Sequence, residues 1–530
     1  MRLGKLFLVC LCGLSLLAGC AQEELIPTDN TLRSVSVFQT EVMVPAEGTV
    51  TLSFAVDSPD YAFNYDAGSS ACDVRLIMAG GKTPTGYTIS QIVPEAQKGR
   101  YTLTLKDNGG IYREEVRLAL VQNEVFITSA FFTVWSEKQY PGPLVKTGLP
   151  VVCLVTENGR EVVSKEEYVP ASLYIRGEGG YESLQPVSCQ VRGRGNTTWT
   201  WPKKPYLIKL DQKESLLGMP RDKRWVLLAN FMDRTLMRNL VSMHVASLTS
   251  LAWTPRCVPV ELIWNGEHRG SYLLIEQVRV DGDRVDISEE DGYLLELDFH
   301  YDNTVQWIDH HGSCWQRGDG IPFGVKHPDP DEMTPEQKLY IKSYISEVAG
   351  VLYGDRFADP TEGYAKYLDV ESFIDYWIVF EVMCNHELSN PGSVFFHKDK
   401  DGILTAGPCW DFDWGVLSFY TSNGEWDLVN GHAIWYDRLF QDPAFENRLK
   451  ARFQQLLPAL SAIPDYMDRC EELLKESASL NFALWNPAED ASQNGGHIIN
   501  GDENLTFHAA VARLKSNYRK HLQVMEKALL

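Results

Sequence analysis

The sequence predicts a multidomain protein in which an all-β, Ig-like sandwich is followed by an α+β domain. The chain has 530 residues, which is more than one ordinary domain contains. Short strand patterns fill residues 35–136, as in TVTLSFAV from Thr49, where apolar and polar residues alternate. From residue 145 onwards, strand patterns come first and helical patterns follow, which is the order typical of an α+β domain.

Composition and charge limit the classes of function. Apolar residues make up 44% of the chain and charged residues 23%, which is typical of a globular protein and not of a disordered one. The formal net charge is −22, and a field of that sign repels phosphate backbones. We therefore expect no nucleic-acid partner.

Residues 1–20 resemble the signal peptide of a bacterial lipoprotein. Arg2 and Lys5 precede an apolar run over residues 6–17 that is too short to span a bilayer. Leu-Ala-Gly then leads to Cys20, the position at which a lipobox cysteine is acylated and becomes the mature N-terminus. We expect lipidation at Cys20 and attachment to a membrane through this anchor. The alternative is an ordinary signal peptide with an incidental cysteine.

The segment after Cys20 predicts a tether and a location. Residues 21–34 are polar and include the early acidic pair Glu23 and Glu24. Such a pair resembles the export signal of surface lipoproteins in some Gram-negative bacteria. Within the cell envelope, the sequence therefore favours the outer membrane or cell surface over the inner membrane.

A proline-rich boundary separates the two predicted domains. Residues 141–143 read Pro-Gly-Pro, which breaks the chain between a β-sandwich at 35–136 and a second domain at 145–530. In the second domain, Asp233 is the predicted N-cap of a helix that continues to about residue 249. Thr334-Pro-Glu-Gln reads as a capping box that opens another helix.

Residues 407–415, GPCWDFDWG, carry the sharpest chemical signal. Asp411 and Asp413 alternate with three aromatic residues, so in an extended chain the carboxylates point one way and the aromatics the other. The aromatics are Trp410, Phe412 and Trp414. Two neighbouring carboxylates repel unless a cation lies between them, and Mg²⁺ is the usual cation where phosphates are the substrate. The alternative is a solvated strand face.

Residues 385–393, NHELSNPGS, form a second polar segment between a predicted aromatic helix and a hairpin. Its asparagine, glutamate and serine side chains can supply a proton acceptor and metal ligands, with Glu387 and Asn390 as the candidates. A polar turn without chemical function explains the same residues equally well.

A third segment resembles an anion-binding arrangement. Gly193 and Gly195 allow the backbone to approach an anion closely, and basic residues flank them. In the strand pattern that follows, Lys209 lies on the face opposite Tyr206 and Ile208. Protein kinases use a strand lysine after a glycine loop to hold phosphates. The order of the three segments matches the order of parts in a kinase. The motifs HRDxxxxN and DFG are absent, which excludes an ordinary protein kinase.

Nine ordered segments together resemble the CotH (spore coat protein H) kinase family over about residues 145–520. They are GLPVV from 148, RGRGNTTW from 192, PKKPYLIK from 202, LGMP from 217, WVLLAN from 225, DRTLMRN from 233, WNGEHRGSY from 264, GYLLELD from 292 and GPCWDFDWG from 407. The resemblance implies an atypical protein-kinase-like domain that transfers phosphate from ATP to serine of a protein substrate with Mg²⁺ or Mn²⁺.

The resemblance also assigns roles to residues. Asp411 resembles the metal-binding aspartate, with Asp413 and Asn390 as candidate co-ligands. Glu387 stands where some members have aspartate as the catalytic base. The candidate nucleotide-binding residues are Lys209 and Arg194 for the phosphates and Glu276, in the segment along the adenine pocket.

Two other classes of function stay open from the residues. One is a kinase-like surface protein without activity, used for binding or adhesion together with its β-sandwich. The other is a glycan-active surface enzyme, since metal-dependent glycosyltransferases also carry Asp-x-Asp and glycosidases use paired carboxylates.

Overall fold

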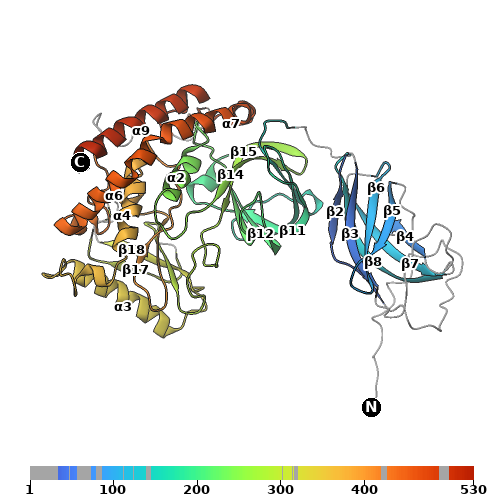
Figure 1. Ribbon diagram of the computed structural model, residues 1–530, viewed down its shortest axis with the longest axis horizontal. Helices are drawn as coiled ribbons and strands as arrows, with labels where there is room; N and C mark the ends of the chain where they lie inside the picture. Colours follow the sequence, from blue (N-terminus) through green and yellow to red (C-terminus); the bar gives the residue numbers. More distant parts are fainter. Residues whose placement is uncertain are drawn as a thin grey trace, which may run out of the picture.

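The computed structural model places two N-terminal sheets at one end of the molecule, a β-barrel in the middle and a helix-rich lobe at the other end (Figure 1). The residues that the structure describes are 34–46, 48–56, 73–78, 86–110, 113–122, 125–138, 145–300, 303–312, 314, 320–418, 427–488 and 500–530. Cys20, residues 21–33 of the tether and the Pro-Gly-Pro boundary lie outside them.

The N-terminal region consists of β-strands, as the alternation of its sequence predicts. One four-stranded sheet has the order β1 (Val35–Val37), β3 (Thr49–Val56), β6 (Arg100–Asp107) and β5 (Tyr87–Pro94). The other has the order β2 (Glu41–Val44), β8 (Val125–Ser136), β7 (Arg113–Gln122) and β4 (Asp73–Met78). The two sheets share one hydrophobic core, to which Phe54, Leu103 and Val116 contribute. The Ig-like topology stays a prediction.

Strand β2 attaches this region to the barrel. The Glu41 carboxylate accepts hydrogen bonds from Trp135 Nε1 at 2.9 Å and from Ser172 Oγ, on a barrel strand, at 2.7 Å. Met43 and Trp135 pack into one buried cluster with Tyr174 of the same barrel strand. Apolar burial and a shared carboxylate therefore join the two parts.

Seven strands form a closed barrel after residue 150. Their order is β10 (Val169–Arg176), β11 (Leu184–Gly193), β12 (Tyr206–Glu214), β13 (Asp222–Leu228), β15 (Glu267–Glu276), β14 (Cys257–Trp264) and β9 (Val151–Thr156), closed by pairing of β9 with β10. Side chains alternate across the wall. On β12, Ile208 and Leu210 fill the barrel, whereas Leu207 lies on the outer face in the core of the helix-rich lobe.

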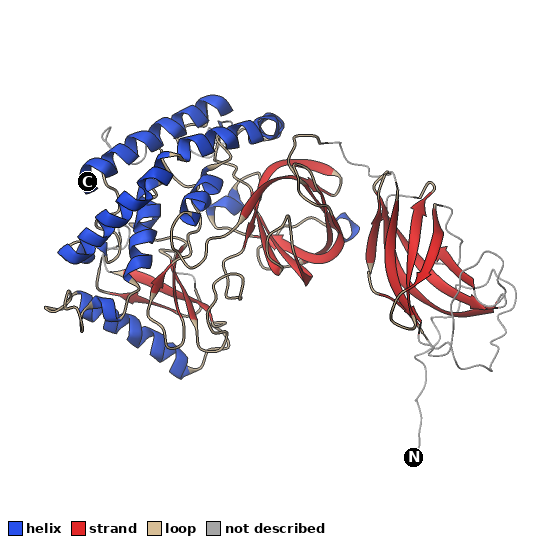
Figure 2. Ribbon diagram, in the orientation of Figure 1, coloured by secondary structure: helices blue, strands red, loops and turns tan. Residues whose placement is uncertain are grey.

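The helix-rich lobe contains a five-stranded sheet and most of the helices (Figure 2). The sheet order is β17 (Gln306–Asp309), β18 (Ile321–His327), β16 (Tyr293–Leu297), β19 (Val394–Lys398) and β20 (Thr405–Ala406). The long helices are α2 (Arg238–Ser247), α3 (Pro335–Leu352), α4 (Val370–Val382), α6 (Pro443–Ser461), α7 (Ile463–Leu484) and α9 (Phe507–Leu529). The short helices of the lobe are η2 (Tyr364–Lys366), η3 (His386–Leu388) and α5 (Tyr436–Leu439). Two further short helices, η1 (Glu157–Gly159) and α1 (Thr197–Thr200), lie between barrel strands.

The structure confirms one of the two predicted helix caps and contradicts the other. Thr334 and Gln337 form the complete capping box at the start of α3. The prediction for Asp233 is wrong, because α2 begins five residues later, at Arg238. The carboxylate of Asp233 instead accepts hydrogen bonds from the backbone N–H groups of Thr235 and Arg238, which shapes the turn before the helix.

A fully buried lysine connects the barrel to helix α7. Lys203 Nζ donates to Ala229 O at 2.7 Å, to Asn481 Oδ1 of α7 at 2.8 Å and to Ser271 O. Three acceptors match the three donors of an ammonium group. A buried cation is tolerated here because each of its hydrogens has a partner.

Lys203→Met should therefore lower the free energy of unfolding by about 3 kcal/mol, because it leaves buried oxygens without a donor. Chemical denaturation measures the change. Lys204→Met is the matched control, since the neighbouring lysine is partly exposed and donates one hydrogen bond, to Trp199 O. Equal effects of the two substitutions would contradict the structural role of Lys203.

Candidate functional site

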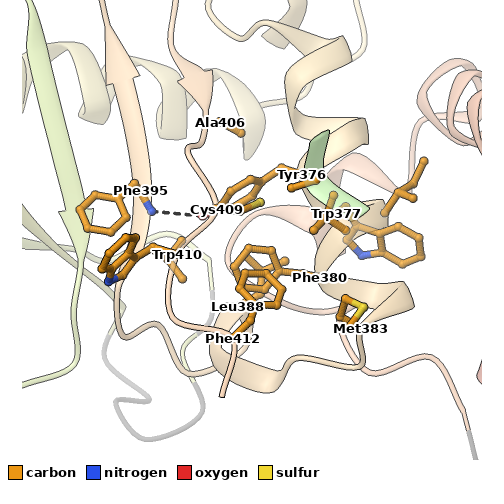
Figure 3. Close-up of a cluster of buried hydrophobic side chains, with 14 of the residues drawn as sticks. Tyr376, Trp377, Phe380, Met383, Leu388, Phe395, Ala406, Cys409, Trp410 and Phe412 are labelled. Atoms are coloured by element: carbon orange, nitrogen blue, oxygen red, sulfur yellow. Dashed lines mark hydrogen bonds between the residues drawn. The ribbon is translucent and has the colours of Figure 1, made fainter. Parts of the chain in front are cut away.

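The segment from Gly407 to Ser418 is an irregular loop, called the acidic loop below, and not a strand. Phe412 is fully buried, with its ring centroid 4.6 Å from that of Phe380 on α4, and Trp410 is 4% exposed. Figure 3 shows Phe412 beside Phe380 and Leu388. Trp414 is 46% exposed, so the three aromatics do not share the one face that the predicted alternation gives them.

The backbone at Asp411 explains the difference. Its φ is 63°, in the left-handed region, which interrupts the extended alternation that the sequence pattern assumes. Aspartate tolerates this region better than most residues, and such conformations persist where the surroundings hold them in place. The surroundings of the acidic loop are therefore decisive for where its carboxylates lie.

The start of helix α2 holds one side of the loop. Asn239 Oδ1 accepts the backbone N–H of Phe412 at 2.8 Å. Arg238 Nε donates to Val416 O at 2.9 Å. Both side chains are buried, so each hydrogen bond is protected from water.

Two further asparagines hold the other side. Asn500 Oδ1 accepts the backbone N–H of Gly415 at 3.1 Å. Asn517, on α9, donates from Nδ2 to Leu417 O at 2.8 Å. Side chains from three distant parts of the sequence thus form hydrogen bonds with backbone groups along the acidic loop. These bonds replace the backbone hydrogen bonds that a strand would form with its neighbours.

Arg238 is itself fixed by two buried carboxylates. It forms an ion pair with Asp233, and its Nη2 lies 2.7 Å from Asp502 Oδ2. All three side chains are at most 2% exposed. Removing one member of such a group leaves a buried charge without compensation, which is strongly destabilising.

The surroundings of Asp411 and Asp413 disfavour the ionised forms of both carboxylates. Burial raises the pKa of Asp411, while the Arg194 guanidinium and a 3.5 Å hydrogen bond from Ser393 Oγ act in the opposite direction. Burial, followed by the negative charges of Asp411 and Asp233, raises the pKa of Asp413 to about 8. The negative charge of the pair is therefore only partly compensated, by Arg194 and Arg238.

Glu387 lies in the same group. Its backbone N–H donates to Asn385 Oδ1 at 2.9 Å, which fixes the turn η3. Burial raises the pKa of Glu387 well above its ordinary value, and the charges of Asp411, Asp413 and Asp298 add to this. Its Oε2 atom is buried and has no hydrogen-bond partner. The structure thus brings together Asp411, Asp413 and Glu387, the three acids predicted from the sequence.

Arg194 is the cation that faces this group. Its guanidinium carbon lies 5.3 Å from the ring centroid of Trp410. Burial lowers the pKa of Arg194, and the charges of Asp411, Asp413 and Glu296 raise it. The predicted nucleotide-binding arginine therefore lies beside the predicted metal-binding aspartates.

Asp298 and Glu296 extend the acidic group, and sequence reasoning did not single them out. Glu296 belongs to β16, and Asp298 directly follows its last residue, Leu297, which pairs with Val394 of β19. The next residue, Phe299, donates its backbone N–H to Pro391 O at 2.7 Å. This pairing brings Asp298 alongside the turn that leads into β19. The available signal was the segment GYLLELD, in which two acids interrupt a buried strand.

The remaining predicted residues lie elsewhere or are already engaged. Lys209 is half-buried on β12, with Nζ 5.9 Å from the ring centroid of Tyr168. Glu276 is fully buried and forms ion pairs with Arg256, at 2.9 Å, and with Arg284. A nucleotide base could therefore meet the Glu276 segment only through its backbone.

Asn390 is half-buried in the turn between η3 and β19, where its Oδ1 accepts from Cys314 Sγ at 3.8 Å. Its role as a metal ligand stays a prediction.

The donor set at the acidic group fits a hard divalent cation. Carboxylate oxygens are the ligands that Mg²⁺ and Mn²⁺ prefer, and Glu387 Oε2 is a buried oxygen without a partner. Within the part of the chain that the structure describes, no three His, Cys, Asp or Glu side chains meet closely enough to hold a metal alone. Mg²⁺ at phosphate-handling sites is commonly held by one or two carboxylates together with substrate oxygens and water.

A buried histidine supports the helix that leads into this site. His521 Nε2 of α9 lies 3.1 Å from Glu381 Oε1 near the end of α4, and the same carboxylate accepts the backbone N–H groups of Val429 and Asn430. Burial alone lowers the pKa of His521, but hydrogen bonds to Cys384 and Glu381 outweigh it and raise the pKa to about 10.

The stability that this pair contributes should depend on pH. Because the pKa of His521 is raised from 6.5 to about 10 on folding, the contribution is complete below pH 6.5 and is lost as the pH rises towards 10. Wild type should exceed His521→Gln in unfolding free energy by about 2 kcal/mol or more at pH 6, and by much less at pH 10. His508→Gln, at an exposed His–Glu pair, is the control and should show no such trend. A pH-independent difference for His521→Gln would contradict the assignment.

The site joins an acidic group in the helix-rich lobe to an arginine from the loop after barrel strand β11. Such a site offers ligands to a cation and a positive charge to an anion at the same place. The model of the family described as "CotH kinase protein" matches residues 191–525, which is more than half of the chain. The chain therefore belongs to the CotH kinase family.

Other comparisons add little. The solved structure entitled "Structure of the S-layer protein SbsC, domains 5-6" matches at 14% identity over 36% of this chain and 94% of that chain, with a TM-score of 0.15. A score of that size carries no argument about fold. None of the curated proteins matches the chain.

Proposed function

We propose that this protein is an atypical kinase that transfers phosphate from ATP to serine of a protein substrate and depends on Mg²⁺ or Mn²⁺. The observation that carries the proposal is the convergence of Asp411, Asp413 and Glu387 beside Arg194. Membership in the CotH kinase family supports a kinase-like function independently.

The chemistry follows from what phosphoryl transfer requires. The protein must position the phosphate and neutralise charge, and it supplies little covalent chemistry. A divalent cation bound at Asp411 and Asp413 would neutralise phosphate charge. Arg194 adds a fixed positive charge beside that position.

Glu387 is the proposed proton acceptor for the serine hydroxyl. Burial, followed by the charges of Asp411, Asp413 and Asp298, raises the pKa of Glu387 and so disfavours the ionised form that accepts a proton. Neutralising the two aspartates lowers this pKa again. A cation at the two aspartates would therefore make Glu387 a better proton acceptor.

The raised pKa of Glu387 also favours a second candidate function. If charge at the site is never balanced, the domain binds ligands without transferring phosphate and acts as a kinase-like surface protein. Nucleotide binding without phosphorylated product is the result that separates this function from the first.

We further propose that the protein is exported and anchored in the cell envelope through lipid on Cys20, at the outer membrane or cell surface. The motif at residues 17–20 supports this. Within the described ranges, no helix has the length and apolar character needed to cross a bilayer.

Asp411→Asn should weaken Mn²⁺-dependent ATP binding by about 100-fold or more, because it keeps the side-chain size and removes the charge that binds the cation. Titration calorimetry on residues 21–530 measures binding, and phosphoserine analysis measures transfer. Asp401→Asn removes an equal charge from an exposed turn and should bind as wild type does. Unchanged metal-dependent binding in Asp411→Asn would refute the proposed role.

Cys20→Ser should release the protein from the membrane fraction or block its processing, because serine lacks the thiol that is acylated. Labelling with a radioactive fatty acid provides the direct readout. Wild-type protein that carries no label would contradict lipidation.

A further inference from the structure

The turn η3, which carries Glu387, is too short to fix its own position. It has three residues and follows α4 after Cys384, whose φ of 50° lies in the left-handed region. A residue with a side chain keeps this conformation only where its surroundings hold it there. Within the turn, Asn385 Oδ1 accepts the backbone N–H of Glu387, and Leu388 is fully buried. The orientation of the turn therefore depends on contacts from outside it.

Asn430, in the loop before α5, binds both ends of this turn. Its Nδ2 donates to Asn385 O, at the start of η3, at 3.1 Å. Its Oδ1 lies 3.3 Å from Ser389 Oγ, at the end of η3, and that hydroxyl shares its single hydrogen between Asn430 Oδ1 and Val429 O. Asn430 is fully buried, so water does not compete for these hydrogen bonds. One amide side chain thus spans the turn with a donor and an acceptor.

The backbone of Asn430 is fixed by helix α4. Its N–H donates to Glu381 Oε2 at 2.9 Å, and its carbonyl oxygen accepts from Trp377 Nε1 at 3.1 Å. Both of these α4 side chains are fully buried. The Glu381 carboxylate also contacts His521 of α9. Asn430 therefore connects the turn to two long helices, each of which has regular hydrogen bonds of its own.

The chemistry of Asn430 separates it from the reacting groups. An amide side chain is neutral and does not take a proton from a hydroxyl at neutral pH. Among the described residues, its hydrogen bonds reach the turn, α4 and the backbone that follows it, and not Asp411 or Arg194. Any effect of Asn430 on phosphate transfer must therefore act through the position of Glu387.

We propose that Asn430 is a positioning residue, which places the Glu387 carboxylate beside the acidic loop by holding both ends of η3. The inference deepens the proposed function and rests on it for the role of Glu387 as proton acceptor. Positioning matters for the rate because a displacement of about 1 Å at a reacting group can lower it about 100-fold. The binding of metal and nucleotide does not depend on this contact, since Asp411 and Arg194 are held by other residues.

Asn430→Ala should lower kcat for phosphate transfer by about 10-fold to 100-fold and leave the KM for ATP within about 2-fold of wild type. Steady-state kinetics on residues 21–530 measures both constants. Asn481→Ala is the matched control, because Asn481 is a buried asparagine of α7 that binds Lys203 and the backbone of Ser271, far from η3 in its contacts. This control should lose stability and keep the wild-type kcat. Equal kcat in the two variants would show that Asn430 is merely structural.

Hydrogen exchange followed by mass spectrometry tests the same contact without any reaction. The backbone N–H groups of residues 385–390 should exchange about 10-fold or more faster in Asn430→Ala than in wild type, because the turn opens more often. Asn481→Ala should leave their exchange unchanged. Should Asn430→Ala fail to fold, Ser389→Ala removes only the contact at the end of the turn and should give a smaller change of exchange and of kcat in the same direction.

The outcomes separate this inference from the proposed function. Unchanged exchange in the turn overturns the inference, whether or not the wild type transfers phosphate. Faster exchange with an unchanged kcat overturns it as well, because the turn would then move without consequence for the reaction. A wild type that transfers no phosphate contradicts the proposed function, and faster exchange in Asn430→Ala then still supports Asn430 as the residue that holds the turn.

Discussion

The buried ion pairs of Arg238 are the constraint on which the site depends. This one side chain pairs with Asp233 before helix α2 and with Asp502 near the C-terminus, and it donates to the backbone of the acidic loop at Val416. None of these charges can stay buried alone, so the three segments are stable only together. A backbone with a left-handed residue at Asp411 is held in this way without any strand pairing. The geometry of the carboxylates is therefore a property of the whole helix-rich lobe.

Negative charge that is not fully compensated lies in the helix-rich lobe, and positive charge that is not compensated lies on the barrel. Asp233 helps to raise the pKa of Asp413, so the group that fixes the loop also adds to the repulsion within it. On the barrel, Lys209 faces the same lobe without a carboxylate partner among the described residues. In a metal-bound polyphosphate, the cation would face the carboxylates of the lobe and the phosphates would face the positive charge of the barrel. Binding of such a ligand would relieve both imbalances, and this links the stability of the empty site to its proposed chemistry.

Local patterns predicted much of the fold, and long-range hydrogen bonds account for what they missed. Alternation identified the strands, and the capping box at Thr334 located a helix start, because both depend on residues close in sequence. Asp411 and Asp413 were also predicted, since carboxylates among aromatics are unusual, whereas Asp298 and Glu296 were not. Trp414 was misplaced because alternation fails at the left-handed Asp411. Asn500 was missed because it binds Gly415 from 85 residues away and follows no local pattern.

The most direct test of the account is a crystal structure with Mn²⁺ and a non-hydrolysable ATP analogue, measured with anomalous scattering at the manganese edge. We expect a manganese peak within coordination distance of Asp411, next to phosphate oxygens, with Arg194 beside them and the phosphate chain running towards Lys209. A peak at another place on the protein, or a nucleotide bound away from the acidic loop, would contradict it.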